Sequence, residues 1–129
     1  MKAVLLIGAV LAVLSISSAP PNKDEVTIHF RYSHFTPTVV TVPAAAKVTF
    51  TLSNDDPIDH EWMVGIPDVH EKHRHGTEAL HGRIPTEVSV PAYSTRVTTV
   101  TFDTPGEFAY ICHLPGHEEY GMSGTVVVR

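Results

Sequence analysis

The sequence predicts an all-β fold, an antiparallel sandwich or barrel, in a chain of 129 residues. Three observations favour it. Short runs rich in Val, Thr, Phe and Tyr recur along the chain, turn residues such as Pro, Gly, Asn and Asp separate them, and no repeated crossover helices lie between them. Apolar residues make up 43% of the chain and charged residues 18%, which is typical of a folded globular protein and not of a disordered one.

The expected strands follow one another from residue 25 to the end of the chain. Val48, Phe50 and Leu52 fall at every second position, so they are expected to face one side of a sheet. Residues 97–102 alternate less strictly but have high strand propensity. The expected strands are Glu25–Arg31, Val39–Val42, Lys47–Ser53, Glu61–Ile66, Glu87–Val90, Thr95–Phe102, Glu107–Cys112 and Gly124–Arg129.

The segment 67–85 breaks this pattern because it is polar, rich in histidine and long for a sandwich loop. We expect a histidine-rich insertion that is partly helical, in which His70 and His73 share a helix face. Imidazoles with a carboxylate suit Cu(II), Zn(II) or Ni(II), so a second metal site is conceivable here, although a solvated loop is the favoured interpretation. The candidate ligands of that second site are His70, His73, His75 and His81.

The first residues have the pattern of a secretory signal peptide. Lys2 supplies a positive charge, residues 4–14 are an apolar run, and residues 15–19 are nearly all small. We therefore expect a signal peptide at 1–19 and an exported domain at 20–129, in a periplasmic, extracytoplasmic or secreted location. A membrane-spanning helix needs about 20 apolar residues. No stable membrane span is expected after removal of the signal, and a retained anchor is the less favoured alternative.

The excess of acidic over basic residues indicates which kinds of partner the protein binds. Nine Lys and Arg against fourteen Asp and Glu give a formal net charge of -5, which disfavours binding to the phosphate backbone of nucleic acids. A protein partner with a basic face fits this charge better, because complementary charge raises encounter rates.

The clearest chemical signal lies near the end of the chain, where Cys112, His117 and Met122 are spaced five residues apart. A thiolate, an imidazole and a thioether suit copper, whereas zinc seldom recruits methionine. A blue-copper centre needs a second imidazole, and His60 is the best candidate because it opens an apolar run after a polar turn. Two alternatives remain for the single cysteine: a buried small hydrophobe, or a nucleophile paired with His117, for which no orienting Asn or Asp is evident.

These residues resemble the cupredoxin family of small blue copper proteins. The matching features are the segment 48–56 leading to His60, the segment 110–117 with its Pro115-Gly116 turn, and the final Gly121-Met122-x-Gly124. The resemblance implies a Greek-key β-sandwich of about seven to eight strands. It also implies a type 1 copper with His60, Cys112 and His117 in a trigonal plane and Met122 as the weak axial ligand.

The sequence departs from the family at two places. Residues 43–46, Pro-Ala-Ala-Ala, stand where a glycine turn is common, and Glu61 follows the first histidine where many relatives carry asparagine. The resemblance implies an electron carrier that exchanges one electron with redox protein partners, and not an enzyme. We expect a monomer. The alternative function is copper trafficking, buffering or sensing, in which the histidine-rich segment loads or donates the metal.

Overall fold

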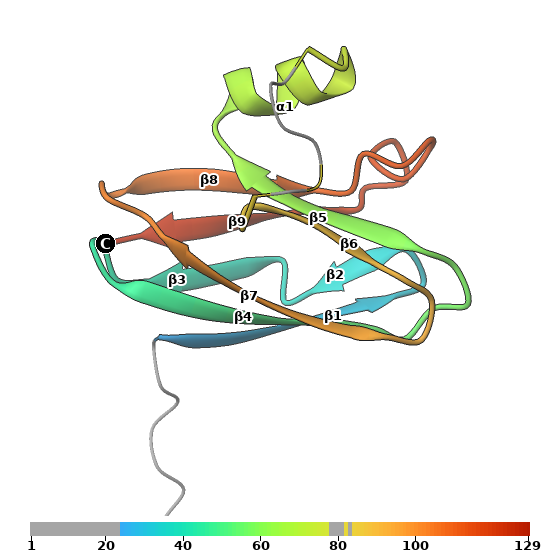
Figure 1. Ribbon diagram of the computed structural model, residues 1–129, viewed down its shortest axis with the longest axis horizontal. Helices are drawn as coiled ribbons and strands as arrows, with labels where there is room; N and C mark the ends of the chain where they lie inside the picture. The colour runs from blue at the N-terminus through green and yellow to red at the C-terminus, as the bar shows by residue number, and fades with distance from the viewer. Residues whose placement is uncertain (1–23, 78–81, 83) are drawn as a thin grey trace, which may run out of the picture.

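Nine strands and one helix run through the part of the chain that the computed structural model describes, residues 24–77, 82 and 84–129. The expected signal peptide lies outside the described residues. The strands form a four-stranded sheet in the order β2-β1-β4-β7 and a five-stranded sheet in the order β3-β9-β8-β5-β6, and the two sheets face each other (Figure 1). The elements are β1 (Glu25–Arg31), β2 (His34–Thr36), β3 (Val39–Val42), β4 (Lys47–Asn54), β5 (His60–Gly65), α1 (Pro67–Arg74), β6 (Glu87–Val90), β7 (Thr95–Thr101), β8 (Gly106–Ile111) and β9 (Ser123–Val128).

The two-sheet sandwich is therefore confirmed, but its expected antiparallel character holds only in part. β1 pairs with β4 in parallel, and β3 pairs with β9 in parallel, while the remaining pairs are antiparallel. Strands joined by a tight turn must be antiparallel, whereas strands distant in the sequence meet in either direction. The alternation of residues within a strand carries no information on this choice.

Each of the eight expected strands matches an observed one, with ends that differ by at most one residue. The strand that the sequence analysis missed is β2, which has three residues. Such a segment is too short to display an alternating pattern. β2 pairs with β1 through a turn in which Tyr32 and Ser33 both have positive φ.

The core lies between the two sheets. Val48, Phe50 and Leu52 of β4 are fully buried, as their alternation predicts. Phe50 packs against Trp62 of β5, with ring centroids 4.9 Å apart. Burying a side chain of this size contributes about 1.5–3 kcal/mol to the stability of the fold. The buried side chains of β4 and β5 therefore hold the two sheets together and fix the loops at the strand ends.

The helix α1 confirms that the histidine-rich insertion is partly helical. Pro67 stands at its first turn, where a missing N–H costs nothing, and Asp68 in the first turn and Arg74 in the last complement the helix dipole. The helix lies over the outer side of the five-stranded sheet (Figure 1) and buries His70. Within the described residues, no helix has the length and apolar character needed to cross a membrane.

Candidate metal centre

Three potential ligands meet at one end of the sandwich. His60 is the first residue of β5, Cys112 directly follows β8, and His117 lies in the loop that leads to β9. This loop and the connection from β4 to β5 lie at the same end of the molecule (Figure 1). The packed strands β5 and β8 are hydrogen-bonded neighbours, so they fix the starting points of His60 and Cys112 relative to each other.

The ligating atoms of these residues face one another. Nδ1 of His60 lies 3.1 Å from Nδ1 of His117, and Sγ of Cys112 lies 3.3 Å from the same Nδ1. One ligand atom from each residue falls within 4.8 Å of the others. His60 and Cys112 are buried, whereas His117 is partly exposed. One edge of the site is therefore accessible from outside.

Met122 closes the same loop. Its side chain is fully buried and belongs to the same core cluster as Cys112. Two backbone hydrogen bonds fix it: the Cys112 N–H donates to the Met122 carbonyl at 3.1 Å, and the Met122 N–H donates to the His117 carbonyl at 3.0 Å. The structure thus brings all four residues named from the sequence into one neighbourhood.

Glycine shapes this loop at two turns. Gly116 and Gly121 have φ values of 85° and 87°, a left-handed conformation that residues with a Cβ adopt only at a cost. Gly116 turns the chain back after Cys112, so His117 faces the thiol, and Gly121 turns it again before Met122. The sequence 112–122 is therefore folded locally so that the Cys112 sulfur and a His117 nitrogen converge, with the Met122 backbone hydrogen-bonded to both residues.

His60 is oriented by Asp56. Nε2 of His60 lies 2.8 Å from Oδ2 of Asp56, which leaves Nδ1 directed at Cys112 and His117. The same buried carboxylate accepts hydrogen bonds from the N–H groups of Tyr32 and Ser33 at 2.7 and 2.8 Å. Burial raises the pKa of Asp56, but these hydrogen bonds outweigh burial, so its pKa lies below the ordinary value and the group stays ionised.

The sulfur and the second imidazole are adapted to a metal. Burial raises the pKa of the Cys112 thiol, although the Glu61 N–H lowers it in part by donating to Sγ at 3.3 Å. A bound metal ion deprotonates such a thiol outright, because the metal carries the largest local charge. Burial also lowers the pKa of His117, followed by its proximity to His60, so the imidazole is neutral and able to ligate.

The donor set of two imidazole Nδ1 atoms, one thiolate and one buried thioether fits copper. Nitrogen and sulfur donors of this kind accommodate both Cu(I) and Cu(II), and two imidazoles with one thiolate and a weak axial methionine are diagnostic of blue-copper sites. A β-sandwich with such a cluster at one end defines a class of small, single-copper cupredoxins. The comparisons with known proteins agree with this class.

The chain belongs to the cupredoxin-like domain family, whose model matches residues 4–128. Among curated proteins, the "Copper-resistant cuproprotein CopI" of Rubrivivax gelatinosus is 32% identical over 98 residues, which is 74% of this chain. The chain spans 59% of the length of that relative. Copper is therefore the cofactor of this family member, and the protein is a copper-binding cupredoxin.

Solved structures show the same fold. The reduced auracyanin of Roseiflexus castenholzii superposes with a TM-score of 0.71 at 20% identity, covering 82% of this chain and 97% of that one. Auracyanin A of Chloroflexus aurantiacus, described as a "blue" copper protein, has a TM-score of 0.66 at 24% identity and covers 81% of this chain and 98% of that one. At these identities the likeness concerns the fold.

The structure separates the histidines that the sequence analysis grouped as a second metal site. His70 and His73 both point from α1 toward the sheet, with His70 buried and the His73 side chain 7% exposed. His75 instead points to solvent and pairs with Glu71 at 2.9 Å. His81 lies outside the described residues. The set His70, His73 and His75 is therefore not brought together as one group.

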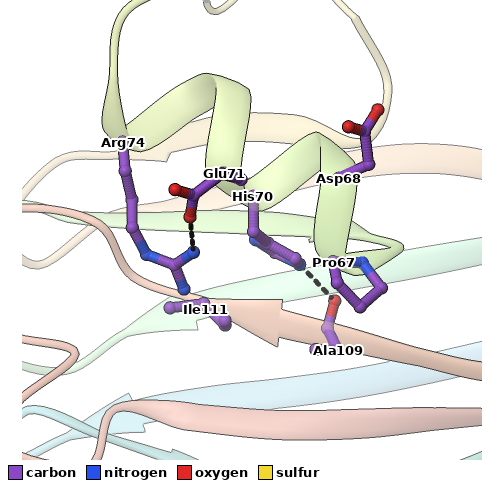
Figure 2. A pocket seen from close by; sticks show the side chains of 7 residues that line it. All are labelled: Pro67, Asp68, His70, Glu71, Arg74, Ala109 and Ile111. Carbon is purple, nitrogen blue, oxygen red and sulfur yellow. Dashed lines mark hydrogen bonds and ion pairs between the residues drawn. The ribbon is translucent and has the colours of Figure 1, made fainter.

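The underside of α1 forms a groove against β8. Its volume is about 530 Å³, and Figure 2 shows the side chains that line it. His70 points across the groove, and its Nε2 lies 3.1 Å from the Ala109 carbonyl. Arg74 extends along the same side and donates to Glu71 at 3.2 Å. The hydrogen bond of the His70 imidazole thus links the helix to the sheet.

Three carboxylates shape the site region; Glu61 was noted in the sequence as a departure from the family, whereas Asp56 and Glu87 were not singled out. Asp56 orients His60, and Glu61 and Glu87 contact His73 from β5 and β6. Strand alternation was the available signal for Glu61, because neighbours of an inward residue face outward. His113 follows Cys112 and lies under α1, with its Nε2 2.8 Å from Nδ1 of His70.

Proposed function

We propose that this protein is an exported electron carrier with one type 1 copper, ligated by His60, Cys112 and His117 in the plane and by Met122 axially. The observation that carries the proposal is the convergence of His60 Nδ1, His117 Nδ1 and Cys112 Sγ beside a buried Met122. The copper would supply a Cu(I)/Cu(II) couple. The chain contributes a rigid set of ligands, which limits rearrangement between the two oxidation states.

The exposed edge of His117 is the expected route for the electron. A shallow hollow of about 330 Å³ surrounds it, lined by Pro115 and Gly116 of the loop and by the exposed side chains Tyr32, Ile58 and Tyr120. An apolar, solvent-facing surface beside a ligand allows close approach of a redox partner. We propose that protein partners dock here, and that a basic partner face complements the net charge of -5.

Copper trafficking or buffering is the second candidate function. The observation that favours it is the similarity to a relative named as a copper-resistant cuproprotein. A carrier of electrons retains its copper in both oxidation states, whereas a trafficking protein releases it to an acceptor. An enzymatic role is not proposed.

Optical and electron paramagnetic resonance spectra during titration with Cu(II) test the ligand set. We expect an intense thiolate charge-transfer band that saturates at one copper per chain and is lost in Cys112→Ser. Ser123→Ala, an exposed change in the same region, is the matched control and should keep the band. Failure of the wild-type protein to develop this band would contradict the type 1 assignment.

Repeated reduction and oxidation in the presence of a Cu(I) chelator separates the two functions. We expect the charge-transfer band to return in full after each cycle, because the carrier keeps its metal. Progressive transfer of copper to the chelator on reduction would instead support trafficking.

A further inference from the structure

A second group of ligating side chains lies on the opposite face of the five-stranded sheet from the copper site. It consists of Glu61 on β5, His73 on α1 and Glu87 at the start of β6. Nε2 of His73 lies 3.2 Å from Oε2 of Glu61, and Nδ1 of His73 lies 3.8 Å from Oε1 of Glu87. One ligand atom from each falls within 4.8 Å of the others, so a single ion is able to contact all three.

Strand geometry explains why this group is separate from the copper site. Trp62 of β5 belongs to the core and His60 packs against the core ring of Phe30, so Glu61 between them points outward under α1. Met63 lies two residues further on the same face and pairs with Glu87 of β6. The helix closes over this face and brings His73 down between the two carboxylates.

The three side chains are almost fully buried, with exposed fractions of 7% for Glu61, 7% for His73 and 1% for Glu87. Two carboxylates beside an imidazole supply negative charge and oxygen ligands, which lower the cost of burying a divalent cation. Imidazole nitrogen and carboxylate oxygen are ligands of Zn(II), and imidazole is a ligand of Cu(II). Without a thiolate or thioether, this donor set is harder than the set at the copper site.

A surface hollow adjoins the His73 side of this group. A hollow of about 210 Å³ borders it, lined by His73, Arg74, His113, Glu118 and Glu119 among others. The ring of His113 packs beside that of His73, with centroids 5.0 Å apart. Glu118 is paired with Arg74 in this lining, and the exposed Glu119 adds a negative charge beside it. His73 thus borders a hollow at the surface.

We propose that Glu61, His73 and Glu87 form a second metal site that binds a divalent cation, Cu(II) or Zn(II), separate from the copper centre of His60, Cys112 and His117. The proposal does not depend on electron transfer at the first centre. The two sites adjoin through the backbone, because Glu61 follows His60, and the Glu61 N–H donates to the Cys112 sulfur at 3.3 Å.

Metal titration of the protein already loaded with one equivalent of Cu(II) tests the proposal. Zn(II) binding is followed by calorimetry, because the d10 ion Zn(II) gives no electron paramagnetic resonance signal, and Cu(II) binding is followed by electron paramagnetic resonance. We expect one further ion per chain in the wild type, with a tetragonal spectrum for Cu(II). His73→Ala is expected to weaken this second binding at least tenfold.

The matched control is His75→Ala, which removes a histidine from the same helix that faces solvent and pairs with Glu71. It should bind the second ion as the wild type does. Glu87→Gln keeps the size of a buried side chain and should also weaken the second ion at least tenfold, which guards against a folding defect in His73→Ala. Equal second-site affinity in His73→Ala, Glu87→Gln and the control, or no second ion in the wild type, would overturn the proposal.

The two proposals fail in different ways. Loss of the thiolate band concerns only the first centre. Because the second site is measured as the difference of one ion between the wild type and His73→Ala, its outcome is independent of where the first copper binds. If Zn(II) binds and Cu(II) does not, or the reverse, the result identifies the cation that the site takes.

Discussion

At the scale of single residues, Asp56 links the turn between β1 and β2 to His60 through one carboxylate. We predict that Asp56→Asn raises the reduction potential of the bound copper. The negative charge of Asp56 beside the ligand His60 stabilises Cu(II) more than Cu(I), and an asparagine side chain lacks that charge. The asparagine side chain also has one acceptor oxygen in place of two, so the free energy of unfolding should fall by about 1–3 kcal/mol.

Spectroelectrochemistry and urea unfolding measure the two effects. Asp55→Asn is the control, because Asp55 is the neighbouring carboxylate and its side chain is 48% exposed. It should change neither quantity appreciably. A potential that stays constant or falls in Asp56→Asn would show that the charge of Asp56 does not act on the copper.

Some of the candidate ligands are easier to predict from the sequence than others, because they lie close together in the chain. Cys112, His117 and Met122 lie in one short segment, so their spacing alone indicates that they converge. His60 is distant in the sequence, and its identification required the chemical rule that a blue-copper site has two imidazoles. Glu87 and Asp56 were not predicted because carboxylates are common on any surface, and only the pairing of strands and loops reveals which ones are buried.

At the scale of the elements, the close approach of β9 to β8 depends on Gly124. Gly124 is paired with Tyr110, and a Cβ at Gly124 would overlap the Tyr110 ring. That ring is buried, and its hydroxyl donates to the Pro37 carbonyl at 2.6 Å, so it has little room to move. We predict that Gly124→Ala lowers the free energy of unfolding by about 1–3 kcal/mol, as overpacking does elsewhere.

Chemical unfolding of the copper-free protein measures this loss without a contribution from metal binding. Ser123→Ala changes the neighbouring exposed residue and should leave stability within about 0.5 kcal/mol of the wild type. A Gly124→Ala variant as stable as this control would contradict the prediction. It would mean that β8 and β9 move apart enough to accept a Cβ at position 124 without loss of stability.

The turn between β3 and β4 carries strain that follows from the sequence. Residues 43–46 contain no glycine, yet Ala45 has a φ of 55°. A left-handed conformation costs a residue with a Cβ roughly 1–2 kcal/mol, and glycine avoids this cost but loses more entropy on folding. We predict that Ala45→Gly stabilises the protein by about 0.5–1 kcal/mol in urea unfolding. Ala46→Gly is the control and should destabilise it or have no effect, since Ala46 is not among the residues with positive φ.

Strand positions were predictable because alternation and turn residues are local properties of the chain. The direction of β1 beside β4 and of β3 beside β9 was not, because it depends on how distant segments meet. The helical insertion was anticipated from its composition, but its docking through His70 onto the Ala109 carbonyl is a tertiary contact. The sequence therefore indicated which elements form, while packing decided which side chains of the insertion point inward.

At the scale of the whole molecule, buried histidines make the copper-free fold sensitive to acid. Burial lowers the pKa of His113 from 6.5 to about 4 and lowers the pKa of His70 as well. The unfolded chain therefore binds more protons than the folded one between these values. We predict that the free energy of unfolding falls as the pH decreases from about 6.5 to about 4.

Urea unfolding of copper-free protein at several pH values measures this slope. His70→Gln keeps a donor for the Ala109 carbonyl but does not titrate, so its slope should be smaller. His75→Gln is the control, because His75 is exposed, and it should retain the wild-type slope. Identical slopes in both variants would mean that the buried His70 contributes nothing to acid sensitivity.

The net charge of -5 predicts how the proposed electron carrier meets its partners. With a cationic metal complex as the oxidant, the reduced protein should react more slowly as salt rises, and with an anionic complex of similar potential it should react faster. Salt shortens the screening length from about 30 Å at 0.01 M to about 8 Å at 0.15 M, so long-range attraction and repulsion both weaken over this range.

Stopped-flow oxidation at several ionic strengths measures both trends. Glu119→Gln removes an exposed charge from the loop that carries His117 and should reduce the salt dependence of the rate. Glu107→Gln is the control, because it removes the same charge from an exposed position at the start of β8, outside that loop. A larger effect of Glu119→Gln would locate the electron's exit at His117. Equal effects of the two variants would mean that only the total charge steers the encounter, and the docking surface would then have to be sought elsewhere on the molecule.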